Sequence, residues 1–160
     1  IEMSDSGLLT IAGGKWTTYR KMAEELVDRA IQVGELIPLS DSQTEDMSVV
    51  GAHEYSSELY EKLENDFKLS KPVAIHLANA YGDRAIQVAR IAQKGLGELI
   101  HPRHPYIEAE VVYTATEEFA VTVQDITHRR MRLGFIDDAA AREAAPRVEK
   151  ILKTIFNDAF

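Results

Sequence analysis

Apolar residues first recur at helical spacing just after residue 17. Between Thr17 and Gly34 they fall three or four positions apart, which predicts one amphipathic helix with an apolar face formed by Tyr19, Met22, Ala23, Leu26, Val27 and Ala30. Before this helix, residues 7–12 form a short apolar run next to glycines, a pattern typical of a buried strand. Residues 47–50 are the best remaining strand candidate, so we expect the partners of the first strand to lie outside this sequence.

The rest of the chain is marked by helix start and stop signals. Residues 34–54 are rich in Ser, Asp, Glu and Gly and predict a linker. Beyond it, the pattern predicts helices that start at Ser56 or Ser57, at Ser70, at Asp83, near 106, near 120, and at Asp137 or Asp138; Pro146 kinks the last one or marks a fresh start. The predicted fold class is mainly α: a helical bundle preceded by a short strand–turn–helix tail.

Composition narrows the function classes. The 160 residues, 45% hydrophobic and 28% charged, suit one globular domain with an appendage. The absence of cysteine from the sequence excludes disulfides, thiolate metal sites and cysteine nucleophiles. A net charge of -8 argues against a protein built to bind nucleic acid.

Residues 12–20, AGGKWTTYR, join the predicted strand to the predicted helix. Glycines let a ligand approach the backbone, and a helix start presents unpaired N–H groups and the positive end of the helix dipole. Lys15, Arg20 and Lys21 crowd this positive end, at a cost of ~0.3–1 kcal/mol each if uncompensated, and a bound anion would reverse the sign. From the residues alone, a plain turn capped by Thr17 or Thr18 is equally consistent.

Residues 7–24, GLLTIAGGKWTTYRKMAE, resemble the C-terminal signature of the FAD-dependent glycerol-3-phosphate dehydrogenases. The positions in register are Gly13, Gly14, Lys15, Thr17, Thr18, Tyr19, Arg20 and Ala23. Three further stretches resemble the helical C-terminal domain of that family: LANAYGDRAIQVARIA, HPYIEAEVVYTATEEFAVTVQDITHRRMRLGF and AAAREAAPRVEKIL. The resemblance therefore covers nearly the whole chain.

The resemblance implies a role and a division of the chain. The family oxidises sn-glycerol 3-phosphate to dihydroxyacetone phosphate, with hydride passing to FAD and electrons to quinone. Residues 1–20 would be the last strand and flavin-facing turn of the FAD domain, 21–54 a connecting helix and linker, and 55–160 a helical cap. Implied partners are the remainder of the FAD domain, glycerol 3-phosphate, quinone and a membrane surface, either the bacterial cytoplasmic or the mitochondrial inner membrane. Nucleic acid is not among them, and the oligomeric state is left open.

The resemblance also implies roles for individual residues. Those beside the flavin, the cofactor-binding set, would be Gly13, Gly14, Lys15, Trp16, Thr17 and Thr18. Lys15 would also be the catalytic candidate and would reach the substrate phosphate, with Arg20 as a weaker second candidate. The Gly-x-Gly-x-x-Gly turn that holds the ADP half of FAD is missing, since Gly95-Leu96-Gly97 lacks its third glycine. We therefore expect a fragment that holds no FAD and is inactive alone, with the catalytic base elsewhere.

Two alternatives of other classes remain at this point. One is a non-catalytic helical interaction or assembly module, for which residues 1–20 would be dispensable. The other is a small phosphate-binding protein that uses residues 14–18 alone.

Other polar candidates favour structural roles. His101 and His104 have a metal-like spacing, but Pro102 and Pro105 oppose a helix there and favour a stiff connector. His76 lies on a predicted apolar helix face and is expected to be a packed, hydrogen-bonded histidine.

Charged clusters in the second half have the same interpretation. The basic cluster His128, Arg129, Arg130 and Arg132 is expected to find carboxylate partners in preference to phosphate. Glu108 and Glu110, two positions apart, are not expected to form a carboxylate pair. Phe119, Val123 and Ile126 are expected in the core.

Overall fold

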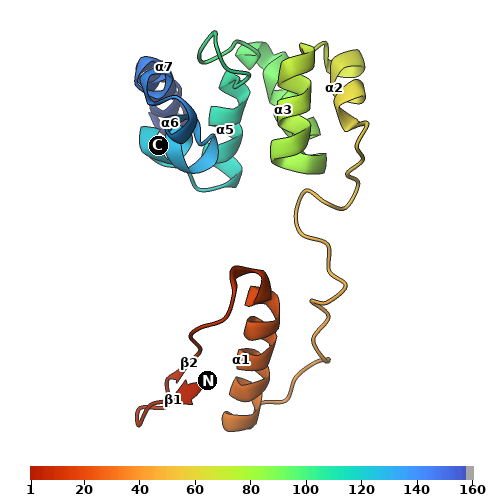
Figure 1. The fold of residues 1–160 in the computed structure, drawn as a ribbon, viewed down its shortest axis with the longest axis vertical. Helices are drawn as coiled ribbons and strands as arrows, with labels where there is room; N and C mark the ends of the chain where they lie inside the picture. Colours follow the sequence, from red (N-terminus) through yellow and green to blue (C-terminus); the bar gives the residue numbers. More distant parts are fainter. Residues whose placement is uncertain (158–160) are drawn as a thin grey trace. The chain divides into compact units, whose positions relative to one another are not determined.

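The computed structural model describes residues 1–157. The chain divides into two compact units, an N-terminal unit, Ile1–Ser48, and a helical unit, Val49–Phe160. Figure 1 shows a small hairpin and one helix in the first and the remaining helices in the second. The mainly α fold is confirmed.

The N-terminal unit begins with a short antiparallel hairpin. Strand β1, Glu2–Met3, pairs with strand β2, Leu9–Thr10. The predicted strand over residues 7–12 is therefore shorter than expected, and it has a partner that the hydrophobic pattern did not reveal. The pairing arises from a tight turn, in which Gly7 has a φ of 84° and donates its N–H to Ser4 O at 2.9 Å. The expectation of a buried strand was wrong here, because Leu9 is only half-buried and Thr10 is exposed.

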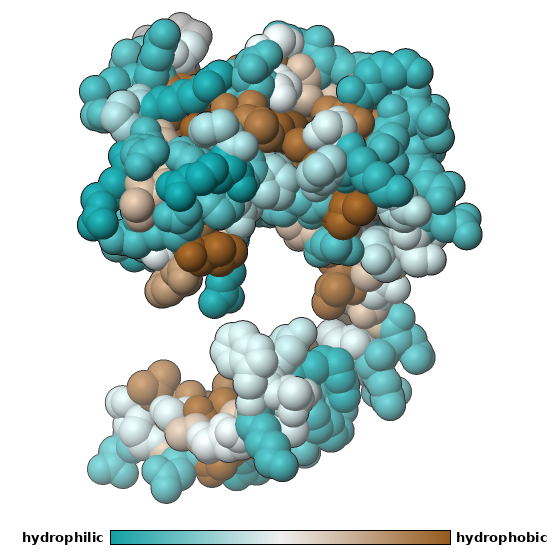
Figure 2. Space-filling view, turned by 45° about the horizontal axis from the view of Figure 1, so that its top comes forward, coloured by the Kyte–Doolittle hydropathy of each residue, from teal (hydrophilic) through white to brown (hydrophobic). Residues whose placement is uncertain are grey.

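Helix α1, Tyr19–Val33, follows a 3₁₀ turn, Trp16–Thr18, and ends at Gly34 as predicted. None of its residues is buried. Its apolar side chains lie at the surface of the N-terminal unit, including Tyr19, Val27 and Val33. Figure 2 shows hydrophobic residues reaching the surface of both units.

The described residues between Val33 and Leu59 contain no helix or strand, residues 47–50 included. The end of this segment belongs to the helical unit and is hydrogen-bonded to the Gly82–Arg84 turn. The Gly51 carbonyl accepts a 2.9 Å hydrogen bond from Asp83 N, and the Asp83 carboxylate accepts one of 2.9 Å from Glu54 N. The backbones touch at Gly82, where an added Cβ would lie 1.9 Å from Gly51 O.

The helical unit contains helices α2 to α7. Their bounds are α2 Leu59–Phe67, α3 Lys71–Tyr81, α4 Ala85–Ile91, α5 Glu108–Glu117, α6 Leu133–Ile136 and α7 Asp138–Asn157. A 3₁₀ turn, Gly82–Arg84, precedes α4, and π turns cover Ala92–Leu96 and Asp125–Arg130.

Several predicted helix boundaries are confirmed and others are wrong. Ser70 precedes α3, Pro72 lies in its first turn and Gly82 ends it, as predicted. Helix α2 has Glu58 at its N-cap in place of Ser56 or Ser57. The Asp83 side chain caps no helix, because it binds Glu54 N. Helix α7 continues through Pro146, which therefore does not mark a fresh start.

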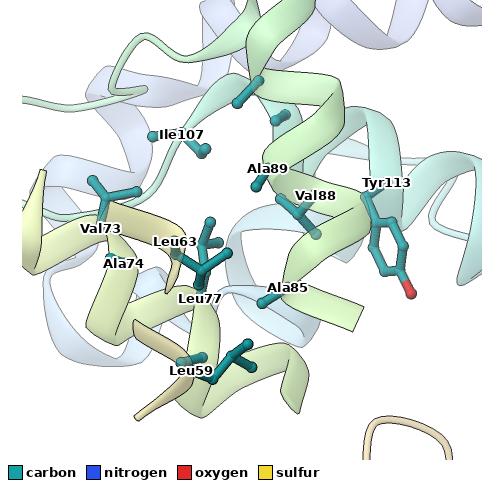
Figure 3. Packing of buried hydrophobic residues seen from close by; sticks show 13 residues of the cluster. Leu59, Leu63, Val73, Ala74, Leu77, Ala85, Val88, Ala89, Ile107 and Tyr113 are labelled. Carbon is teal, nitrogen blue, oxygen red and sulfur yellow. The ribbon is translucent and has the colours of Figure 1, made fainter. Parts of the chain in front are cut away.

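Two hydrophobic cores share helix α5. Figure 3 shows the first core, in which side chains of α2, α3, α4 and α5 meet around the fully buried Leu63 and Leu77. The second core joins α5, the Asp125–Arg130 turn, α6 and α7, and it buries Ile126, Leu133 and Val148 completely. Tyr113 of α5 contributes to the first core and Val111 to the second. In Figure 1, α5 accordingly lies between α3 and the α6–α7 pair.

The segment after α5 corrects one predicted core residue. Ile126 is buried and Val123 is half-buried, but Phe119 is 91% exposed and has a φ of 59°. The reason is that α5 ends at Glu117 and the next helical segment starts after Thr122, so Phe119 lies in the turn between them. Thr122 and Asp125 cap that start reciprocally, with Asp125 N bound to Thr122 Oγ1 and Thr122 N to Asp125 Oδ2. The backbone N–H groups of Thr122 and Val121, which both donate to the Asp125 carboxylate, lower the pKa of Asp125.

Asp137 caps helix α7 and also contacts the connector at residues 101–105. Its Oδ1 accepts from Ala140 N at 3.0 Å, and its Oδ2 lies 3.0 Å from His104 Nε2 and 3.3 Å from Arg103 Nη2. The backbone bond from Ala140, followed by the His104 contact, lowers the pKa of Asp137.

Because the folded-state pKa of Asp137 is lowered, its ionised form favours folding. This contribution is complete above the unfolded-state pKa, about 3.9, and is lost as pH falls through the folded value. We expect Asp137→Asn to be less stable than the wild type at pH 7 and the difference to shrink steadily below about pH 4. Thermal unfolding across pH checks this, with Asp138→Asn as the control. A difference that is the same at pH 7 and pH 2 would contradict it.

Candidate functional site

The predicted site is the turn between the hairpin and α1. Gly13 and Gly14 both have a positive φ, 96° and 81°. A Cβ at Gly14 would lie 2.7 Å from Met22 Sδ and 3.0 Å from Thr18 Oγ1, whereas a Cβ at Gly13 would have nothing within 4 Å. The positive φ favours glycine at both positions, a Cβ at Gly14 would displace the Met22 side chain of α1, and Gly13 leaves the backbone accessible.

The helix start after this turn has unused backbone donors. Lys15 is extended, and its carbonyl accepts from Thr18 N at 2.9 Å and from Thr18 Oγ1 at 2.8 Å. The helical hydrogen bonds begin with the N–H groups of Thr18 and Tyr19. The N–H groups of Trp16 and Thr17 precede them and have no side-chain cap. Thr18 occupies the N-cap position of α1, as one interpretation predicted, but its side chain makes no capping hydrogen bond.

The three cations near this helix start have different surroundings. Arg20 Nη1 lies 2.5 Å from Glu24 Oε2 and also donates to Thr44 Oγ1 at 3.1 Å. Lys21 Nζ lies 2.6 Å from Glu24 Oε1. In the part of the chain that the structure describes, no carboxylate lies within 4.0 Å of the Lys15 ammonium. The cost of crowding Arg20 and Lys21 is therefore offset by Glu24.

The titration of these groups reflects the same contacts. The hydrogen bond to Glu24 raises the pKa of Arg20 and that of Lys21. In return, the hydrogen bonds from Lys21 and Arg20 lower the pKa of Glu24. Residues 15–18 are all exposed, Trp16 at 89%, so the turn is open to an incoming group.

A buried carboxylate in the helical unit was missed from the sequence. Glu110 is fully buried and accepts from His76 Nε2 at 2.8 Å, from Tyr81 OH at 3.0 Å and from Ile107 N at 2.9 Å. Burial, with the nearby Glu110 carboxylate, raises the pKa of the Tyr81 hydroxyl, which keeps its proton as donor. The expectation that His76 is packed and hydrogen-bonded is confirmed. The available signal was position, because Glu110 follows the core residue Ile107 by three and precedes the core residue Tyr113 by three.

The two connector histidines each contact a carboxylate of α7 or its cap. His101 Nε2 lies 3.0 Å from Glu143 Oε2, and His104 Nε2 lies 3.0 Å from Asp137 Oδ2. Over residues 1–157, no three or more His, Asp or Glu side chains are grouped so that they could hold a metal ion. This arrangement gives His101 and His104 structural contacts.

The basic cluster after Thr127 also has local partners. Arg129 pairs with Asp125, and Arg130 donates to the Glu118 carbonyl at 2.6 Å. The Arg132 guanidinium lies 5.6 Å from the Phe135 ring centroid. The predicted carboxylate partners are confirmed for Arg129, and Arg130 Nε lies 3.5 Å from Glu118 Oε2. None of the helices within residues 1–157 has the length and apolar character needed to cross a bilayer.

Comparison with known proteins gives related sequences. The chain is 45% identical to a probable mitochondrial glycerol-3-phosphate dehydrogenase of Caenorhabditis elegans, covering 95% of this chain and 22% of the relative. It is 43% identical to the mitochondrial glycerol-3-phosphate dehydrogenase of Mus musculus with the same coverage. The probable mitochondrial enzyme of Dictyostelium discoideum is 40% identical, with 95% of this chain and 24% of the relative covered. The chain thus spans about a fifth to a quarter of the length of these relatives.

No solved structure matches the chain. Residues 42–157, which include every helix of the helical unit, match the model of the family described as the C-terminal domain of alpha-glycerophosphate oxidase. This match covers well over half of the chain. The chain therefore belongs to the family of C-terminal domains of alpha-glycerophosphate oxidase.

Proposed function

We propose that this chain is the C-terminal part of an FAD-dependent glycerol-3-phosphate dehydrogenase that converts sn-glycerol 3-phosphate to dihydroxyacetone phosphate. The likeness to glycerol-3-phosphate dehydrogenases over 95% of the chain supports this. The observation that supports a site within this chain is the exposed turn at residues 13–18. Lys15 in this turn has no carboxylate partner among the described residues and lies beside free backbone N–H groups.

The division of labour along the chain is part of the proposal. Residues 1–20 form the flavin-facing edge of the catalytic domain, 21–54 connect, and 55–160 form a helical cap. The absence of any buried residue in α1 supports this division, because such a helix has too little core to be stable alone. The two well-filled cores of the helical unit are consistent with a cap that folds on its own contacts.

The turn offers hydrogen-bond donors that suit the electron-rich edge of an aromatic ring. The N–H groups of Trp16 and Thr17 face no protein acceptor, Gly13 leaves room for close approach, and the helix dipole favours negative charge at this end. FAD, when bound, supplies the two-electron acceptor. In this chain Gly13, Gly14, Lys15, Trp16, Thr17 and Thr18 would lie beside its isoalloxazine ring, and the residues that grip the rest of FAD would lie elsewhere in the parent enzyme. We therefore expect this chain alone to hold no FAD and to be inactive.

Lys15 is the residue that we assign to the substrate. A flexible ammonium can approach a phosphate as a point charge while the neighbouring N–H groups hold the ring. Arg20 is the weaker candidate, because Glu24 and Thr44 already bind its guanidinium.

The parent enzyme is proposed to work at a membrane. Electrons pass from the flavin to quinone, and the relatives' description as mitochondrial supports the mitochondrial inner membrane over a bacterial cytoplasmic membrane. The remainder of the FAD domain is then the direct partner of residues 1–20.

Replacing Lys15 with alanine in the full-length enzyme tests the proposal. Removing one charged contact to a phosphate should lower kcat/KM for glycerol 3-phosphate by roughly 10- to 100-fold, since hydrogen bonds to charged groups contribute about 1.5–3 kcal/mol. Lys21→Ala is the matched control, because Lys21 is a nearby lysine already paired with Glu24. Steady-state kinetics decide: equal values for the wild type and Lys15→Ala would remove Lys15 from the site.

A further inference from the structure

Glu24 forms ion pairs with two of the three cations near the proposed site, and the proposed function gives it no role. It lies on α1, four residues after Arg20 and three after Lys21, and its two oxygens each receive one of these cations. The Glu24 side chain is only 16% exposed, against 33% for Arg20 and 56% for Lys21. The carboxylate therefore lies beneath two longer cationic side chains and fixes both.

Arg20 is directed toward a groove of the N-terminal unit that does not include the turn. This groove runs between α1 and residues 38–44, and Arg20, Glu24 and Thr44 line it while residues 13–18 do not. Thr44 Oγ1 accepts from the same Arg20 nitrogen that contacts Glu24. Two independent contacts thus hold the guanidinium in the groove.

Without those contacts, Arg20 and Lys21 would be close to the turn. They follow Thr17 by three and four residues, the separations that place side chains above the same helical turn. Arg20 is also the stronger phosphate ligand by nature, because its planar fork binds two oxygens at once. An arginine there would bind the phosphate of substrate and product equally, which adds uniform binding without accelerating the reaction.

We propose that Glu24 is a positioning residue that withholds Arg20 and Lys21 from the phosphate site, so that Lys15 alone sets its affinity for the phosphate group. This inference rests on the proposed function. It predicts that loss of the Glu24 charge strengthens phosphate binding, the reverse of what damage to the helix would do.

The test is the inhibition constant of inorganic phosphate, competing with glycerol 3-phosphate, in the full-length enzyme. Glu24→Gln keeps the shape and removes the charge, and should lower both this constant and the KM for glycerol 3-phosphate by roughly two- to fivefold, the range for an exposed charge pair, with no gain in kcat. Glu25→Gln makes the same change in net charge at the next, exposed residue and should leave both constants unchanged. An equal response of the two variants, or weaker phosphate binding in Glu24→Gln, would overturn the inference.

Arg20 provides a second, independent arm. In the Glu24→Gln background, Arg20→Gln should remove most of the gain in phosphate binding, because the released guanidinium is then missing. If Arg20→Gln alone weakens phosphate binding, Arg20 is itself a ligand and the inference is wrong, whether or not the Glu24 variant folds. If Lys15→Ala has no effect on kcat/KM, the proposed site fails, whereas a Lys15 effect without a Glu24 effect overturns only the inference.

Discussion

Replacing Glu110 with alanine is expected to lower the free energy of unfolding of the helical unit by about 3–5 kcal/mol, the range found when one partner of a buried charged contact is removed. Glu110 is 0% exposed and accepts from three donors, on His76, Tyr81 and Ile107. The alanine would leave all three donors without this acceptor, with the Ile107 N–H buried and His76 and Tyr81 half-buried, and each unpaired group adds its desolvation cost. The loss is comparable with the whole stability of a small domain, 5–15 kcal/mol.

The control for this variant lies two residues earlier on the same helix. Glu108 pairs with Arg147 at 2.7 Å on a more open surface, so Glu108→Ala should cost no more than about 1 kcal/mol. Urea unfolding followed by near-UV circular dichroism measures both, because Tyr81, Tyr106 and Tyr113 belong to the helical unit and the only tryptophan does not. Similar losses at Glu108 and Glu110 would contradict the importance of the buried contacts.

Replacing Gly82 with alanine is expected to lower the free energy of unfolding by about 2–6 kcal/mol. The added Cβ would lie 1.9 Å from the Gly51 carbonyl oxygen, a backbone atom that cannot turn aside as a side chain could. Gly82 also has φ 57° and ψ −135°, a conformation that is nearly exclusive to glycine. Strain of about 1–3 kcal/mol adds to overpacking of about 1–3 kcal/mol, and separating the two backbones would weaken the Asp83 N to Gly51 O hydrogen bond.

The variant Gly95→Ala distinguishes the cost of backbone strain from the cost of a steric clash. Gly95 has a φ of 92° but nothing within 4 Å of an added Cβ, so Gly95→Ala should show the conformational cost alone, about 1 kcal/mol. Differential scanning calorimetry of the two variants gives the comparison. If Gly82→Ala is no less stable than Gly95→Ala, the contact with Gly51 has no energetic weight.

Helix positions could be predicted where the signals are local. The start at Ser70 with Pro72, the stop at Gly82 and the end of α1 at Gly34 depend on backbone preferences of single residues, which act regardless of the tertiary fold. The separation of a linker from a helical region followed from composition for the same reason.

Features that depend on distant partners could not be predicted. Glu110 contacts His76 from 34 residues away. Its spacing from Ile107 and Tyr113 indicates the buried helix face, but the side-chain donors that satisfy its carboxylate come from elements far away in the sequence. The β1–β2 hairpin was missed because its strands are too short to show an alternating pattern. Phe119 was misplaced because it forms an apolar stripe with Val123 and Ile126 at four- and three-residue spacing, although the chain turns at Phe119 with a positive φ.

The candidate site was partly accessible from sequence. Its glycines, helix start and lysine are local features and occupy the predicted turn. The pairing of Arg20 with Glu24 was also readable, because four residues separate them on a helix. The contact of Arg20 with Thr44 depends on how residues 38–44 follow α1, which only the three-dimensional structure reveals.

Helix α1 has a cellular consequence that follows from its lack of buried residues. Chaperones and proteases recognise apolar segments that a folded protein would cover, and they act on them continuously. Within residues 1–157, Tyr19, Val27 and Val33 stay exposed even when both cores of the helical unit are complete. Quality control would therefore treat this chain, made by itself, as an unfinished protein, and its lifetime would depend on a covering surface for α1.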